Sequence, residues 1–305
     1  MIRVKKNTTT VLCLLFVLCL LSPAGQNQTI TDALGQTHVL GDPPHRIVSL
    51  APNVTEILFA LGLEKEIVGV TRYCNYPEKA RTKERIGGMI DPDLEKIIQI
   101  KPDLVIAFRG NPLRMVHRLK DLGLPVFVLD EGTTLESVFV LIQKIGRITR
   151  REKAAENLIS PLRGNLESIK NRLKKASQKP KVFIDLYGKG LWTFGAKSLL
   201  NDLVSNALGE NIAGQIPRAW FNYTREEIIH QNPDFIVIIS KSFADFREIK
   251  TWITEKSHLE SVKAVQKGNI YFLDEDLIAR PGPRLFQAFA QLARILHPSL
   301  FEEKP

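Results

Sequence analysis

The stretch EKIIQIKPDLVI at residues 95–106 decides the fold, because EEIIHQNPDFIV at residues 226–237 repeats its pattern. Both stretches contain a glutamate, two adjacent isoleucines, a Pro-Asp pair and then an apolar run, at a constant offset of 131 residues. The isoleucines indicate a short helix, and the apolar run indicates a buried strand. Because one unit occurs twice in the same frame, the sequence predicts two similar lobes.

Helical and strand patterns alternate on either side of one long amphipathic stretch. Residues 46–147 and 182–296 alternate short apolar runs with helical patterns, which is typical of parallel sheets covered by helices. Between them, residues 150–177 repeat apolar positions every three or four residues, and Pro180 closes the stretch. The sequence therefore predicts an α/β protein: two parallel-sheet lobes bridged by one long helix, with a ligand cleft between the lobes.

Several boundaries follow from these patterns. We expect an export signal at 1–24, an N-terminal lobe at 25–148, a bridging helix at 149–178 and a C-terminal lobe at 179–305. Residues 28–40 alternate β-branched and polar residues around a glycine, which predicts a short hairpin. Asn53 with Glu56, and Thr133 with Glu136, have the spacing of helix-capping pairs.

The N-terminus is typical of an exported protein. Basic residues precede the apolar run at 11–21, which is shorter than the roughly 20 residues that span a bilayer. Ser22-Pro23-Ala24 then provides small residues for cleavage after Ala24. Two alternatives remain, an uncleaved anchor and a lipoprotein, although the residues before Cys19 match a lipoprotein signal poorly. We expect a periplasmic or otherwise extracytoplasmic protein.

Charge and composition argue against several classes of protein. The 305 residues include 42 basic and 33 acidic ones, and removal of residues 1–24 leaves 39 against 33. The remaining basic residues alternate with acids along helical patterns, which indicates a solvated face rather than a nucleic-acid site. Cys74 then stays as a single cysteine, so no internal disulfide is expected.

Motifs for catalysis are missing from the sequence. It has no phosphate-binding glycine loop, no nucleophile elbow and no histidine pair at metal-ligand spacing. We therefore expect a non-enzyme without catalytic residues, resident metal or cofactor.

Aromatic and charged residues near strand ends are the candidates for a ligand site. Parallel sheets bind ligands beyond the carboxyl ends of their strands. Trp192 and Trp220 are expected in loops near such ends, and Asp276 and Arg280 follow the strand at 270–273. Each aromatic residue alone is as readily explained by core packing, and the charged pair by mutual pairing at the surface.

The segments RIVSLAPNVTEILFALG (46–62), VGVTRYCNYP (68–77) and LEKIIQIKPDLVIAFRG (94–110), with GENI (209–212) and TREEI (224–228), resemble a known family. It comprises the exported binding proteins of iron-siderophore and cobalamin ABC importers, and the resemblance covers nearly all of the chain after residue 24. It implies a monomer that captures cobalamin or a related corrinoid and delivers it to a membrane permease. The closest likeness is to its cobalamin-binding members.

The same resemblance implies roles for individual residues. The positions that align with the cleft of the family, including departures at the methionine and at residues 186–187, are Tyr73, Met89, Phe108, Leu186, Tyr187, Trp220, Asp276 and Arg280. Trp192 joins these candidate ligand residues because it is expected near a strand end. Of these, the Asp276–Arg280 pair is implied to hydrogen-bond corrin side amides. Glu95 and Glu226 match an exposed pair, one per lobe, that docks on permease arginines, although both are also ordinary helix N-terminal acids.

Other ligands and roles remain open. An anionic ferric siderophore would use Arg72, Arg109, Arg218 and Arg280, and a haem would use Tyr73 as an axial ligand. An envelope scaffold or sensor that binds no small molecule is a further alternative, and a metal-dependent envelope enzyme has no ligand cluster to support it.

Overall fold

The computed structural model describes residues 28–130, 132–186 and 188–301. The expected export signal and Tyr187 lie outside these described residues. The chain divides after Asp42 into two compact units. The first unit contains the predicted hairpin, in which β1 (Thr29–Thr31) pairs antiparallel with β2 (Thr37–Val39). No helix in the described ranges combines the length and apolarity needed to cross a membrane.

The N-terminal lobe of the second unit contains a four-stranded parallel sheet in the order β4-β3-β5-β6. Side chains of β3, β5 and β6 pack with α2 and α3 in one buried apolar cluster. The elements of this lobe are β3 (Ile47–Ser49), α1 (Pro52–Ala60), β4 (Ile67–Val70), η1 (Glu78–Thr82), α2 (Leu94–Ile100), β5 (Leu104–Phe108), α3 (Leu113–Asp121), β6 (Val126–Leu129) and α4 (Leu135–Ile148).

The C-terminal lobe contains a sheet in the order β10-β8-β7-β11-β12, with β9 added beside β7. Strands β7, β9, β11 and β12 are parallel, whereas β8 and β10 form an antiparallel ribbon at one edge. Its elements are β7 (Lys181–Leu186), β8 (Trp192–Phe194), α6 (Leu199–Asn206), β9 (Glu210–Asn211), β10 (Trp220–Asn222), α7 (Arg225–Gln231), β11 (Phe235–Ser240), α8 (Phe243–Glu255), α9 (Lys263–Gln266), β12 (Ile270–Asp274), α10 (Glu275–Ile278), α11 (Leu285–Leu296) and η2 (Pro298–Leu300).

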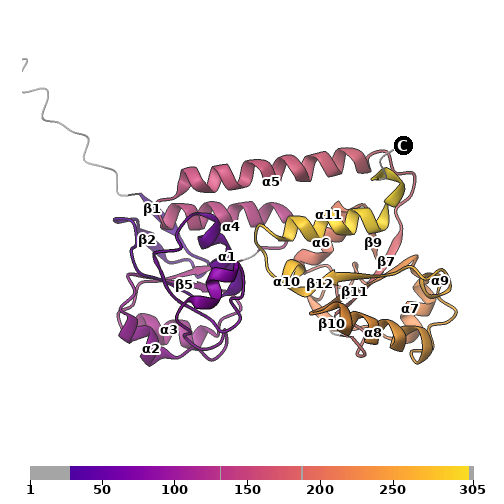
Figure 1. Cartoon of the computed structure of the whole chain (residues 1–305), viewed down its shortest axis with the longest axis horizontal. Coiled ribbons are helices and arrows are strands. Elements are labelled where there is room, and N and C mark those ends of the chain that lie inside the picture. Colours follow the sequence, from indigo (N-terminus) through magenta and orange to yellow (C-terminus); the bar gives the residue numbers. More distant parts are fainter. Residues whose placement is uncertain (1–27, 131, 187, 302–305) are drawn as a thin grey trace, which may run out of the picture. The chain divides into compact units, whose positions relative to one another are not determined.

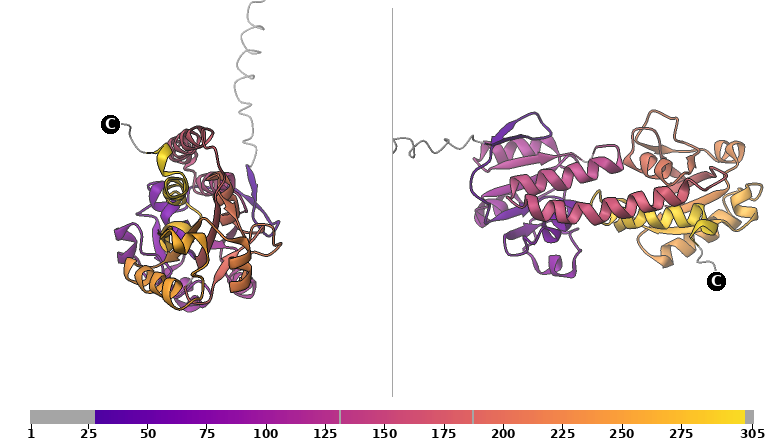
Figure 2. Two further views of the ribbon diagram at one scale, coloured as in Figure 1. Left: turned by 90° about the vertical axis from the view of Figure 1, so that its right-hand side faces the viewer. Right: turned by 90° about the horizontal axis from the view of Figure 1, so that it is seen from above.

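The long helix α5 (Glu152–Leu173) joins the two lobes. It packs against α4 of the N-terminal lobe and against α11 of the C-terminal lobe (Figures 1 and 2). Pro161 lies inside the helix, and both Pro161 and Asn157, whose carbonyl loses its helical donor, are exposed. Water can therefore satisfy that carbonyl, and the helix continues. The predicted fold class is confirmed.

The internal repeat is a structural repeat. Helices α2 and α7 begin and end at positions 131 residues apart, and their C-caps Lys101 and Asn232 are both left-handed. The Asp103 carboxylate accepts hydrogen bonds from the amides of His45 and Arg46, and the Asp234 carboxylate accepts one from the amide of Lys181. The Pro-Asp pair therefore fixes the entry of the first parallel strand in each lobe.

Both predicted capping pairs are wrong. Helix α1 begins after Ala51 with Pro52 in its first turn, so Asn53 and Glu56 are inside the helix and buried. Proline preorganises the first turn without a side-chain cap. Helix α4 is capped by Thr134, which forms a capping box with Ser137.

Candidate functional site

A cavity of about 580 Å³ lies between the lobes, at the carboxyl end of β5. Three predicted ligand residues line it: Met89 and Phe108 from the N-terminal lobe and Trp220 from the C-terminal lobe. Its other lining residues are Arg109, Gly110, Lys197, Ser198, Leu199, Leu200, Ala219, Ile278, Ala279 and Pro281. Cavities of this size and mixed lining are typical of small-molecule sites.

Asn111 holds the N-terminal wall of the cavity in place. Its Oδ1 accepts a hydrogen bond from the Phe108 amide at 2.7 Å. Its Nδ2 donates to the carbonyls of Leu50 at 3.0 Å and Met89 at 2.8 Å. Asn111 is only 4% exposed, so one buried amide joins the ends of β3 and β5 to the Met89 segment. The sequence analysis missed this residue, although an Asn-Pro pair just after a strand is a turn signal.

The C-terminal wall is built on the antiparallel ribbon. Trp192 and Trp220 begin β8 and β10, so the prediction that they lie in loops is wrong. Trp220 is in register with Phe194, and their rings meet edge to face at 6.1 Å. Trp220 and Trp192 are 50% and 42% exposed, and of the two only Trp220 lines the cavity.

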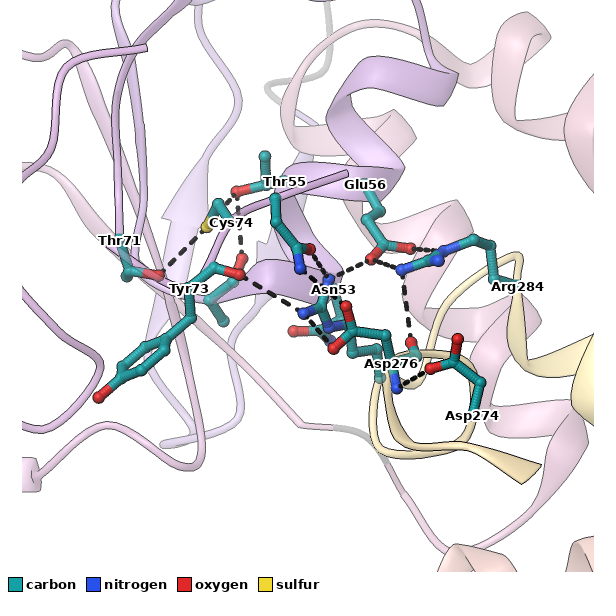
Figure 3. Close-up of polar contacts among 12 residues, drawn as sticks. Asn53, Thr55, Glu56, Thr71, Tyr73, Cys74, Asp274, Asp276 and Arg284 are labelled. Carbon is teal, nitrogen blue, oxygen red and sulfur yellow. Dashed lines mark hydrogen bonds and ion pairs between the residues drawn. The ribbon is translucent and has the colours of Figure 1, made fainter. Parts of the chain in front are cut away.

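The other predicted contact residues lie elsewhere. Tyr73 is 51% exposed, and its ring points away from Glu56 (Figure 3). Leu186 is buried at the end of β7 in register with Trp192. Neither lines the cavity.

A buried ionic network joins α1 to the segment around α10 and α11 (Figure 3). Glu56 accepts hydrogen bonds from Arg284 Nε at 2.8 Å, from Arg284 Nη2 at 2.6 Å and from Arg280 Nη1 at 3.0 Å. The Glu56 side chain is 2% exposed, and those of the two arginines are 11% and 13% exposed. Burial lowers the pKa of Arg284, but its hydrogen bond and charge interaction with Glu56 outweigh burial, and the pKa is raised.

The predicted pair Asp276 and Arg280 belongs to this network. Arg280 donates to Asp276 Oδ1 at 2.5 Å and to Asn75 Oδ1 at 2.6 Å, and Asn75 Nδ2 donates to Asp276 Oδ2 at 2.8 Å. The Asp276 side chain remains 39% exposed. Arg280 therefore links the lobes through Glu56 and Asn75, and neither Arg280 nor Asp276 is among the residues that line the cavity.

Glu95 and Glu226 occupy equivalent exposed positions in the first turns of α2 and α7. Neither carboxylate has a hydrogen-bond or ion-pair partner among the residues that the structure describes. One turn later, Ile98 and Ile229 are 41% and 39% exposed, again at an offset of 131 residues. Each lobe thus presents one acid beside one exposed isoleucine.

Cys74 fits a structural role. It is 1% exposed and lies 3.1 Å from the hydroxyls of both Thr55 and Thr71 (Figure 3). Burial raises the pKa of its thiol. A protonated, inaccessible thiol is a poor nucleophile and metal ligand. Across the described ranges, no group of three or more His, Cys, Asp or Glu residues could hold a metal ion.

Residues 47–277 match the periplasmic binding protein family. The chain belongs to this family. Its members bind solutes for ABC transporters and are not enzymes, so a small-molecule ligand, an extracytoplasmic location and a permease partner follow from membership.

Relatives of this family differ in what they are named for. An uncharacterised ABC transporter substrate-binding lipoprotein of Bacillus subtilis is 31% identical over 281 residues, which cover 90% of this chain and 87% of that protein. The periplasmic vitamin B12-binding protein of Vibrio cholerae is 26% identical with a TM-score of 0.74, over 85% of this chain and 99% of that one. A periplasmic haem-binding protein of Pseudomonas aeruginosa shares the fold at 22% identity and a TM-score of 0.74, over 84% of this chain and 94% of that one.

Proposed function

We propose that this periplasmic binding protein captures cobalamin or a related corrinoid between its lobes and delivers it to an ABC importer permease. The observation that carries the proposal is the cavity in which Met89 and Phe108 face Trp220 across the lobes. A corrin has broad apolar faces and an amide fringe. Burying one large apolar side chain against such a face contributes roughly 1.5–3 kcal/mol.

Three further arguments support a corrinoid. The B12-binding protein of Vibrio cholerae is matched over 99% of its own length and over 85% of this chain. Met89 is unbranched and polarizable, so it can cover a flat ring where the family has an aromatic residue. Asp276 would accept hydrogen bonds from the corrin amides, which otherwise lose their water on binding.

A haem or a ferric siderophore is the second candidate. The exposed hydroxyphenyl group of Tyr73 is available as an iron ligand. Among the four arginines suggested for an anionic complex, Arg72 pairs with Asp91, Arg109 with Asp130, and Arg280 with Glu56. Arg218 has no acidic partner in the described part of the chain, so it could pair with an anionic ligand. A third possibility is a scaffold or sensor, which would bind none of these ligands.

Tryptophan fluorescence tests the proposal. Cyanocobalamin, haemin and a ferric siderophore are titrated into the purified protein and into its W220F and W252F variants, because Trp252 packs in the C-terminal core away from the cavity. We expect saturable quenching at one equivalent of cyanocobalamin, lost mainly in W220F. Tighter binding of haemin or the siderophore would favour the second candidate, and saturation by none would favour the scaffold.

The Glu95–Ile98 and Glu226–Ile229 pairs would form the permease-docking surface. Repeated acids on exposed helices suit two basic sockets, and the isoleucines would add apolar contact. We expect E95R/E226R to abolish uptake while ligand affinity stays unchanged. The variant E152R/E167R, with the same charge change on α5, is the control. Loss of ligand binding in E95R/E226R, or normal uptake, would contradict the docking role.

Export with cleavage after Ala24 completes the proposal. Mass spectrometry of the protein recovered from the cell envelope would test it. A mature chain that begins at Gly25 supports cleavage, and a lipid-modified N-terminus would favour tethering.

A further inference from the structure

The charged side chains around the cavity are not balanced. No acidic residue is among the described residues that line it, whereas Arg109 and Lys197 are. Arg109 is neutralised by Asp130 at 2.5 Å. Lys197 makes no ion pair with any residue that the structure describes. The unbalanced charge therefore lies on the C-terminal side of the cavity.

A second unpaired cation lies next to Lys197. The Lys197 amide donates to the Arg218 carbonyl at 3.4 Å, and the Gly195 amide donates to the Ala219 carbonyl at 3.2 Å. A Cβ at Gly195 would lie 2.3 Å from the Ile216 carbonyl oxygen, so only glycine permits this approach. Arg218 is exposed and, within the described ranges, has no ionic partner.

The backbones of Lys197 and Arg218 are adjacent, and neither side chain has an ionic partner among the described residues, so their positive charges add at this edge of the cavity. Lys197 lines the cavity, and Arg218 directly precedes Ala219 and Trp220, which form part of its apolar lining. Charge beside an apolar wall acts more strongly on a ligand than charge in open water. The place where an anionic group of a bound molecule gains most is therefore this edge of the cavity.

We infer that Lys197 and Arg218 form a subsite for an anionic oxygen group at the edge of the ligand. The inference rests on the proposed solute-binding function and adds the chemical class of the ligand periphery. The group is a phosphodiester if the ligand is a cobalamin, through its nucleotide loop, and a carboxylate if it is a haem or a siderophore. A neutral ligand without such a group would leave both cations unpaired.

Matched ligand pairs test the subsite. Cyanocobalamin is compared with dicyanocobinamide, which lacks the phosphodiester, and haemin with its dimethyl ester. Affinities are measured for the unsubstituted protein, for K197Q/R218Q and for K153Q/K170Q, which removes the same charge from an exposed and a partly exposed position on α5. Both variants should keep the melting temperature of the unsubstituted protein, because exposed cations contribute little to stability.

We expect K197Q/R218Q to bind one ligand, the member of its pair that carries the phosphodiester or the carboxylates, about tenfold more weakly. The partner that lacks this group should bind with unchanged affinity. That loss should shrink as salt rises from 50 to 500 mM, and K153Q/K170Q should show none. The pair that responds identifies the anionic group. Equal weakening for both members, or none for either, would overturn the subsite and leave the proposed function standing. No binding of any of the four ligands would overturn the proposed function, and the subsite with it.

Discussion

Glu56 offers the sharpest test of how the lobes are held together. Its carboxylate is 2% exposed and meets three guanidinium nitrogens of Arg280 and Arg284 within 3.0 Å. In E56Q the side chain keeps its volume but loses its charge, so nearly buried Arg284 loses its counterion and Arg280 keeps only Asp276. Breaking a buried ion pair from one side costs roughly 3–5 kcal/mol.

The expected effect is large enough to measure by thermal unfolding. Each kcal/mol lowers the melting temperature of a protein of this size by about 2–4 °C, so E56Q should melt about 10 °C lower. The control is E64Q, because Glu64 pairs with Lys79 at 3.0 Å but is 43% exposed. An exposed pair contributes about 0–1 kcal/mol, so E64Q should barely shift the transition.

Two results would refute this reasoning. One is an E56Q transition as close to that of the unsubstituted protein as the E64Q transition. The other is additivity in a double-mutant cycle with R284M, because residues in one network should show a coupling energy of roughly 0.5–3 kcal/mol.

Three further predictions follow from buried polar groups. Burial raises the pKa of Asp185 well above its usual range, and neither of its carboxylate oxygens has a hydrogen-bond partner among the residues that the structure describes. The pKa of Asp185 is higher in the folded protein than in the unfolded one. The stabilising effect of protonated Asp185 is therefore complete below about pH 3.9, the pKa of an unperturbed aspartate, and is lost as pH rises toward the folded pKa. The melting temperature of D185N minus that of the unsubstituted protein should therefore increase from pH 4 to 7, and a constant difference would contradict the raised pKa. N111A should lower the free energy of unfolding by about 3 kcal/mol in urea, from roughly 1–3 kcal/mol for each buried group left unpaired, and should weaken ligand binding; full affinity would mean that the Met89 wall forms without it. The Cys74 thiol should react with a thiol reagent only after denaturation, and fast reaction of the native protein would refute its burial.

The sequence predicts the two lobes correctly because each copy of the repeat contains residues that define a helix and the start of a strand locally. The glutamate, isoleucines and Pro-Asp pair at 95–103 and 226–234 correspond to helices and strand entries that coincide at one offset. The spacing of Asn53 and Glu56 predicts a capping pair, and this prediction is wrong. Helix α1 is buried on nearly all sides, so the Glu56 carboxylate points inward. Its partners lie 224 and 228 residues away, and no periodicity reports contacts over such a separation.

The cavity shows the same limit. Phe108 and Trp220 reach it from different lobes. Their places near strand ends and the family resemblance point to both residues, but no spacing between them in the sequence predicts that they meet. The glycines beside Trp192 predict a loop, whereas in the structure they permit a tight antiparallel ribbon. The charge balance around Lys197 could not be read from the sequence, because it depends on which arginines find carboxylates after folding.

The helix α5 connects the lobes through the chain, and the Glu56 network connects them through side chains. A further link is the stacking of Phe139 on Phe286, which joins α4 to α11. Lobes that are held together at more than one place resist moving apart, so the width of the cleft between them is set before the ligand binds. Capture would then involve little domain movement, and release could not be driven by spontaneous relaxation of the receptor. The transporter, which consumes ATP, would then supply the free energy that separates the lobes. The ion pairs of Arg280 and Arg284 with Glu56 are the contacts that this separation would break.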